Sequence, residues 1–133
     1  MAQRKGVDHG ANEIVSELRY ETLLPITRLE AEKALSSGDT AAKIYALLRS
    51  AHHDPDWRWV QDTCIEHALN ADFELAYTAT ICFGHLARIH GALDLNKVMP
   101  VLTKLRKDPA HKGVVEDIIQ EIRFFTSDRN DEL

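Results

Sequence analysis

Apolar residues recur at helical spacing along most of the chain, and short polar breaks separate the periodic stretches. One stretch, for example, places Ile44, Leu47, Leu48 and Ala51 on one side of a helix. Clear strand alternation is missing, and only residues 14–24 are ambiguous between helix and strand. Breaks of two to four residues make successive helices antiparallel neighbours, so the chain is restricted to a helical bundle or a stack of helical hairpins.

Capping and helix-breaking residues predict where each helix begins and ends. Thr27 is followed three residues later by Glu30, which is the spacing of a capping box. Asp54 is predicted to cap a helix in which Pro55 holds an early position, where its missing N–H costs little. Pro100 falls inside a periodic stretch, where we expect a kink or a shifted helix start. The other signals are Asp39 or Thr40, Asp72, Asp94 and Asp108 at helix starts, and Gly38 and Gly91 after helix ends. The predicted helices span residues 27–35, 41–51, 54–69, 72–90, 94–107 and 108–125.

Repeated patterns within the sequence distinguish a stack of helical hairpins from a helical bundle. Leu75 and Val114 begin similar apolar patterns that lie 39 residues apart, close to the HEAT-repeat period of about 40. The Asp-Pro pairs at Asp54 and Asp108 indicate that one kind of joint is repeated. We therefore predict an all-α fold, a HEAT-like α-α solenoid of about three antiparallel helical hairpins. Residues 1–133 form a single domain in this prediction, with polar ends at 1–12 and 127–133 that we expect to be flexible.

Charge and composition narrow the class of partner. The 133 residues carry a net charge of −5, with 21 acidic against 16 basic side chains. This balance disfavours a nucleic-acid binder, which needs a basic face, and favours a basic protein partner. The longest uncharged run, residues 75–87, is too short and too polar to span a bilayer. We therefore expect no partner membrane and no partner nucleic acid.

The two cysteines and the first residues indicate the compartment. Cys64 and Cys82 both lie in apolar helical patterns and form no CxxC motif, which predicts reduced, buried side chains. The beginning of the sequence, MAQRKGVDHGANE, has no apolar core segment of the kind found in signal peptides. A cytoplasmic location is therefore expected.

The histidines and acids around residue 54 could suggest a metal site. His52, His53, Asp54 and Asp56 are adjacent across a helix junction, which makes convergence on one ion difficult. We interpret both aspartates as helix caps and both histidines as groups favoured at a helix C-terminus. No nucleophile motif or phosphate-binding loop is found in the sequence. The prediction is therefore a protein that is not an enzyme, with no metal and no cofactor.

A second cluster of polar residues occurs in GHLARIHG, residues 84–91. His85 and His90 point about 140° apart on a helix, so they do not easily share a ligand. Gly84 costs about 1 kcal/mol relative to Ala inside a helix, which predicts a close approach to another helix. Arg88 is predicted to pair with an aspartate such as Asp56. A structural role is favoured for these side chains, and contact with a partner is the alternative.

Both tryptophans occur in DPDWRWVQ, residues 54–61. Trp57 and Trp59 point about 200° apart on a helix, so one core stripe cannot hold both. Trp57 lies at the edge of the inner face and is predicted to pack there. Trp59 leans away from that face, so it either closes a groove between helices or contacts a partner.

DPDWRWVQDTCIEHAL, ATICFGHLARIHG and DPAHKGVVEDIIQEI together resemble a group of small bacterial HEAT-like proteins. The resemblance covers about residues 27–125, and its specific parts are DPDWRWVQ and GHLARIHG. Members of the group resemble immunity proteins encoded beside polymorphic or contact-dependent growth-inhibition toxins. Residues 1–26 match nothing in this group.

The resemblance implies a binding protein that neutralises a cognate antibacterial toxin, the C-terminal toxin domain encoded next to it. A nuclease toxin has a basic active site, which an acidic inhibitor can occlude. The acids that repeat every four residues are the candidates for this contact: Glu13, Glu17 and Glu21 near the N-terminus, and Asp62 and Glu66 beside Trp59. The alternative is a non-catalytic scaffold for an endogenous enzyme or regulator. A HEAT-like DNA glycosylase is disfavoured because the chain is acidic and short.

Overall fold

The computed structural model describes residues 23–70 and 72–131 of the chain. The three glutamates at positions 13, 17 and 21 lie outside these described residues. All regular structure in the described part is helical, which confirms the predicted all-α class. The helices are α2 (Arg28–Leu35), α3 (Thr40–His53), α4 (Trp57–Ala68), α5 (Phe73–His90), α6 (Leu95–Leu105) and α7 (Pro109–Asp131).

Local capping explains most of these boundaries. The Thr27 hydroxyl accepts the N–H of Glu30 at 3.1 Å, and the Glu30 carboxylate accepts the N–H of Thr27 at 3.0 Å. This reciprocal pair is the predicted capping box. Asp39 caps α3 and Asp72 caps α5, each with one hydrogen bond from a backbone N–H to its carboxylate. Gly91 ends α5 with a φ of 62°, a left-handed conformation that favours glycine.

The predicted start of the fourth helix is wrong by two residues. Asp56, not Asp54, is the N-cap of α4, because its carboxylate accepts the N–H of Trp59 at 3.1 Å. Asp54 instead terminates α3, and its carboxylate accepts the N–H of Asp56 at 2.9 Å. Pro55 therefore lies in the turn between the two helices rather than in the first turn of α4.

The second Asp-Pro pair does open a helix. Pro109 is the first residue of α7, and the Asp108 carboxylate accepts the N–H of Ala110 at 3.0 Å. Both Asp-Pro pairs therefore share the hydrogen bond from the N–H two residues later to the aspartate carboxylate, as the predicted repetition requires, but only the second proline is the first residue of a helix. The helix α7 is also longer than predicted, since no glycine or proline interrupts the polar residues that follow Phe125. Pro100 lies inside α6 without ending it.

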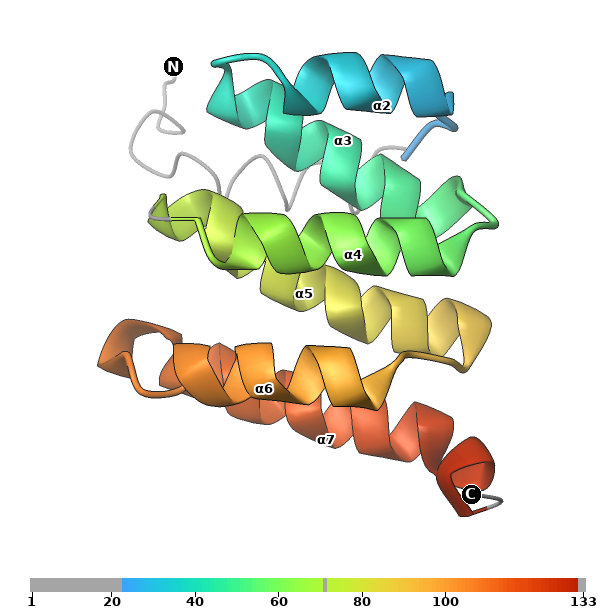
Figure 1. The fold of residues 1–133 in the computed structure, drawn as a ribbon, viewed down its shortest axis with the longest axis vertical. Coiled ribbons are helices and arrows are strands. Elements are labelled where there is room, and N and C mark those ends of the chain that lie inside the picture. Colours follow the sequence, from blue (N-terminus) through green and yellow to red (C-terminus); the bar gives the residue numbers. More distant parts are fainter. Residues whose placement is uncertain (1–22, 71, 132–133) are drawn as a thin grey trace, which may run out of the picture.

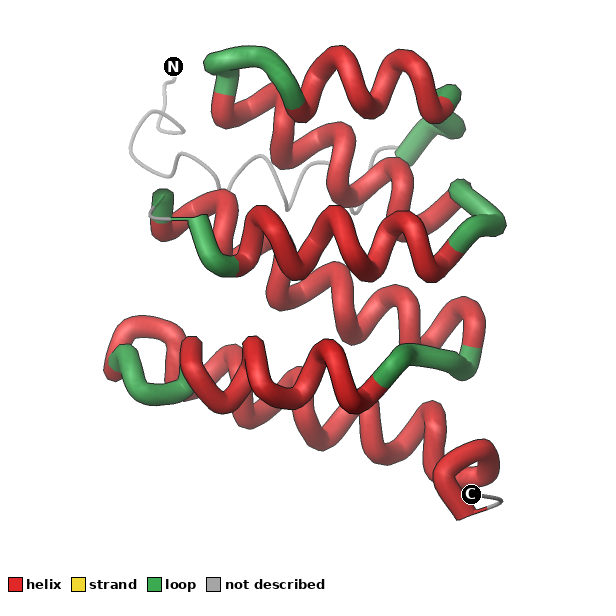
Figure 2. Tube along the Cα trace, in the orientation of Figure 1, coloured by secondary structure: helices red, strands yellow, loops and turns green. Residues whose placement is uncertain are grey.

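The helices form two layers of three (Figure 1). The helices α2, α4 and α6 lie in front in this view, and α3, α5 and α7 lie behind them. Consecutive helices pair as the hairpins α2–α3, α4–α5 and α6–α7, which follow one another down the long axis. The connecting loops lie at the two sides of the stack (Figure 2). The further assignment to HEAT-like solenoids stays a prediction.

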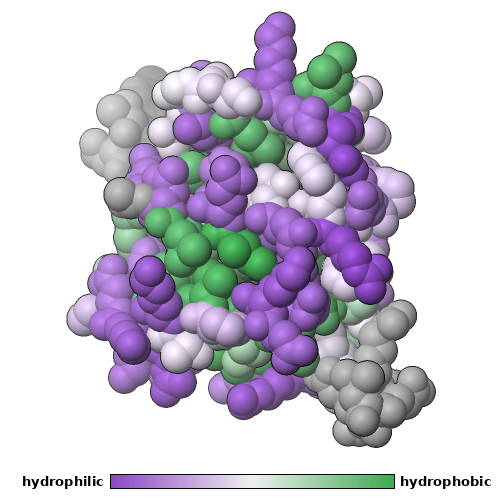
Figure 3. All heavy atoms as spheres, in the orientation of Figure 1, coloured by the Kyte–Doolittle hydropathy of each residue, from purple (hydrophilic) through white to green (hydrophobic). Residues whose placement is uncertain are grey.

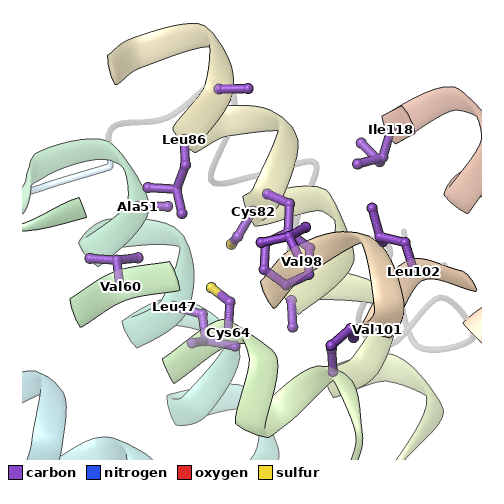
Figure 4. Packing of buried hydrophobic residues seen from close by; sticks show 14 of the residues in the cluster. Leu47, Ala51, Val60, Cys64, Cys82, Leu86, Val98, Val101, Leu102 and Ile118 are labelled. Atoms are coloured by element: carbon purple, nitrogen blue, oxygen red, sulfur yellow. The ribbon is translucent and has the colours of Figure 1, made fainter. Parts of the chain in front are cut away.

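The core lies between the two layers (Figure 4). Leu47 of α3, Leu86 of α5 and Leu102 of α6 are among its fully buried side chains. Cys64 and Cys82 are buried and free, as predicted, and they are turned toward each other across α4 and α5. The hydrogen bond with Cys64, together with burial, raises the pKa of the Cys82 thiol well above its usual value. Among the helices that the structure describes, none is long and apolar enough to cross a membrane.

Candidate functional site

Arg28 connects the first hairpin to the residues between α3 and α4. Its Nε lies 3.3 Å from Asp54 Oδ2, and its Nη2 lies 3.4 Å from Asp56 Oδ2. The guanidinium carbon also lies 3.9 Å from the centre of the Trp59 ring, within cation–π range. The hydrogen bond from the Trp59 N–H and the neighbouring Arg28 both lower the pKa of Asp56. Residues 54–61, called the α3–α4 joint from here on, are thereby held against α2.

Gln61 connects the same joint to the third hairpin. Its side chain is 1% exposed, and its Oε1 accepts the backbone N–H of Asp94 at 2.7 Å, at the start of α6. Its Nε2 donates to Asp62 Oδ1 at 3.2 Å. The Asp94 side chain makes no capping hydrogen bond at the start of α6. The Gln61 side chain therefore holds the backbone at this helix start. Gln61 was not predicted from the sequence, although a polar residue three positions before the inward-facing Cys64 is a usable signal.

The two tryptophans both pack against the core while keeping part of their surface exposed. Arg58 covers Trp57 with its guanidinium 4.4 Å from the ring centre. Trp59 lies in a hollow of about 250 Å³ whose other lining residues come from α2, its C-cap residue Ser36, and α4. The structure therefore places Trp59 in a groove between two helices, and its contact with a partner stays a prediction.

The predicted acidic surface is only partly described. Asp62 and Glu66 are exposed on α4, and Asp62 forms an ion pair with Lys97 of α6 at 3.5 Å. Glu66 lines the hollow beside Trp59. Figure 3 shows the face that α2, α4 and α6 present, where polar side chains surround an apolar area between α4 and α6. The structure brings Trp59, Asp62 and Glu66 to one helix but does not relate them to the three N-terminal glutamates.

GHLARIHG lies in the second half of α5, in the other layer. A Cβ on Gly84 would lie 2.4 Å from Glu121 Oε1 and 2.9 Å from Ile118 Cδ1, so α7 packs closely where glycine stands. This agrees with the predicted close approach. The predicted pairing of Arg88 with Asp56 is wrong, because Arg88 bonds His85 Nδ1 at 2.9 Å and Asp56 is held by Arg28.

His90 is the second histidine of GHLARIHG. Its Nε2 is buried and has no hydrogen-bond partner among the described residues. It contributes to neither the joint nor the hollow beside Trp59.

A groove of about 690 Å³ runs across α3, α5 and α7. The groove is lined by Leu23, His52, His53, Ile81, His85, Arg88, Val114, Asp117, Ile118 and Glu121. The imidazole rings of His52 and His85 lie 4.6 Å apart between their centres. Burial, and then the nearby Arg88 and His53, lower the pKa of His52. His52 also bonds the carbonyl oxygen of Leu48 through Nδ1 at 3.0 Å, and His53 contacts that of Leu23.

The side chains of His52, His53, Asp54 and Asp56 do not converge on one point. His52 and His53 point into the groove, whereas Asp54 and Asp56 bind Arg28. Within residues 23–70 and 72–131, no three His, Cys, Asp or Glu side chains are placed to hold a metal ion. The groove offers imidazoles, a guanidinium and two carboxylates beside apolar side chains, a combination suited to recognising charged side chains.

Comparison with known proteins finds a similar chain among the solved structures. No protein-family model matches the chain, and the search of curated proteins gives no match. A chain in the crystal structure of a CDI (contact-dependent inhibition) complex from Cupriavidus taiwanensis LMG 19424 is 31% identical, with a TM-score of 0.72. The similarity covers 83% of this chain and 97% of that chain. The chain therefore belongs to the same protein family as this component of a contact-dependent inhibition complex, and the predicted resemblance to immunity proteins of such systems is confirmed.

Proposed function

We propose that this chain is a bacterial immunity protein that binds and neutralises a cognate antibacterial toxin. The observation that carries the proposal is its 31% identity to a component of a CDI complex over nearly the whole of that component. A protein of this kind acts by stoichiometric binding in the cytoplasm of the cell that it protects, and it catalyses nothing. The partner is the C-terminal domain of the large toxin encoded next to it.

The charge of the chain supports a nuclease as the toxin. A nuclease needs a basic active site to bind phosphates, and the chain has a net charge of −5. Opposite charge accelerates association between two proteins and suppresses wrong partners. Occlusion of that basic site is then the simplest mechanism of neutralisation.

Co-expression tests the proposal directly. The toxin domain alone should stop growth of a bacterial host, and co-expression of this chain should restore growth. The purified proteins should form a complex, and nuclease activity should fall to zero near one equivalent of the chain. A non-cognate immunity protein serves as the control and should restore nothing. Absence of both rescue and binding would refute the proposal, and co-purification of a host enzyme instead would favour the scaffold alternative.

A further inference from the structure

The groove is built by all three hairpins, because α3, α5 and α7 each supply part of its lining. Its lining includes the apolar side chains of Ile81, Val114 and Ile118. Its volume of about 690 Å³ falls in the usual range for sites that enclose a ligand or an inserted protein segment. A partner that fills the groove would therefore contact every hairpin of the stack.

The positive and negative side chains of the groove lie on different helices. Arg88 lies on α5, next to the imidazoles of His52 and His85. Asp117 and Glu121 lie one turn apart on α7, so both carboxylates project from the same side of that helix. The groove thus has a basic side on α5 and an acidic side on α7.

The charged groups of the groove are not used in the ion pairs that join the helices. The ion pairs among the described residues join Arg28 to Asp54 and Asp56, Lys97 to Asp62, and Arg106 to Glu116. None of these pairs includes a residue that lines the groove. Within the part of the chain that the structure describes, Arg88, Asp117 and Glu121 form no ion pair. Charges left open in a concave, partly apolar site are available to charges on a partner.

Gly84 determines where one of these carboxylates lies. Because glycine has no Cβ, Glu121 Oε1 can approach to 2.4 Å from the position that a Cβ would occupy. The Glu121 carboxylate is therefore drawn across α7 toward α5 and into the groove. The sequence motif around Gly84, His85 and Arg88 thus shapes both charged sides.

We infer that this groove is the surface on which the toxin docks, an inference that rests on the proposed function. The toxin inserts a segment that places a basic side chain between Asp117 and Glu121 and an acidic side chain at Arg88. An apolar side chain between them covers Ile81 and Ile118. This assignment moves the contact surface from α4, where the sequence placed Asp62 and Glu66, to the opposite layer.

Matched charge reversals on the two layers test the inference. The groove variants are Asp117→Lys/Glu121→Lys and Arg88→Glu. The controls on α4 are Asp62→Lys/Glu66→Lys, which has the same spacing and charge change, and Arg58→Glu. Affinity for the purified C-terminal toxin domain is measured by titration calorimetry, and thermal unfolding shows whether each variant is folded.

We expect both groove variants to weaken binding by about 30-fold or more, because each leaves a desolvated charge of the toxin unpaired. The α4 controls should change affinity by less than about threefold, as exposed charges at a distance do. Loss of affinity in the α4 variants with unchanged binding by the groove variants would overturn the inference while the proposed function stands. No binding by the unaltered chain would instead refute the proposed function and, with it, the docking surface.

Hydrogen exchange of the unaltered complex gives a second test that needs no variant. Amides in residues 81–88 and 114–121 should exchange more slowly when the toxin domain is bound than when the chain is free. Amides in residues 58–66 should change little. Protection confined to residues 58–66 would contradict the groove as the docking surface.

Discussion

The α3–α4 joint and the GHLARIHG segment of α5 differ in what their polar side chains bind. In the joint, Asp54 and Asp56 bind Arg28, and Gln61 binds the start of α6. In α5, Arg88 bonds only a neighbouring imidazole within the described residues, and the carboxylate drawn toward Gly84 has no cation. Both segments are rich in histidine, aspartate or arginine, yet the charges of the joint form ion pairs, whereas Arg88 forms none among the described residues.

This difference indicates that the joint contributes to the stability of the fold and the groove to the binding of a partner. Polar groups that bind one another across helices fix how the hairpins pack, and losing one leaves its partner unsatisfied. Charges that remain open contribute little to folding and can contribute to association. Substitutions in the joint should therefore reduce stability, and substitutions in the groove should reduce binding.

Gln61→Ala should produce the largest loss of stability. It creates a cavity and removes the acceptor of the Asp94 N–H, so we expect the free energy of unfolding to fall by about 3 kcal/mol. Urea denaturation measures the change. Gln120→Ala, on the exposed side of α7, is the matched control and should change it by less than about 0.5 kcal/mol. Equal losses in the two variants would mean that Gln61 does not connect α4 to α6.

Trp59→Ala should have the next largest effect on folding. The ring packs against the core and under Arg28, but part of it is exposed, so we expect a loss of about 2 kcal/mol. Toxin affinity of the folded variant should stay within about threefold of the original value. A much larger loss of affinity with little loss of stability would show that Trp59 contacts the partner, and the separation between joint and groove would fail.

The parts of the fold that were predicted correctly depend on neighbouring residues in the sequence. The capping box of Thr27 and Glu30, the caps at Asp39 and Asp72, and the glycine after α5 are recognised within one helical turn. Their geometry needs no knowledge of the rest of the chain. The helical class follows from the same local information.

The errors occurred where distant residues decide between local alternatives. Asp54 and Asp56 can each cap a helix, and Arg28, 26 residues before Asp54, binds both of them in the turn. Arg88 was paired with the wrong residue for the same reason. The groove could not be predicted, because its sides come from three helices whose register only the packed core defines.

Gly84→Ala should change both the stability of the fold and the shape of the groove. An added methyl favours the helix by up to about 1 kcal/mol but must displace Ile118 and Glu121, so we expect a net loss of about 1 kcal/mol. It should also weaken toxin binding, since the Glu121 carboxylate is moved out of the groove. Gly113→Ala is the matched control, because nothing lies within 4 Å of its Cβ position and helix stability should rise. Unchanged binding by Gly84→Ala would show that the position of Glu121 does not matter.

His52 should give the smallest effect, visible as a dependence of stability on pH. Burial and the nearby Arg88 lower its pKa in the folded chain below the ordinary value of 6.5. As the pH falls through that value, the unfolded chain takes up a proton before the folded chain does, so folding stability decreases. His52→Asn keeps a donor for the Leu48 carbonyl but does not titrate, and its stability should decrease less steeply toward acid. Denaturation between about pH 8 and pH 5 measures both slopes. Identical slopes would mean that the imidazole facing the groove is as readily protonated in the folded chain as in the unfolded one.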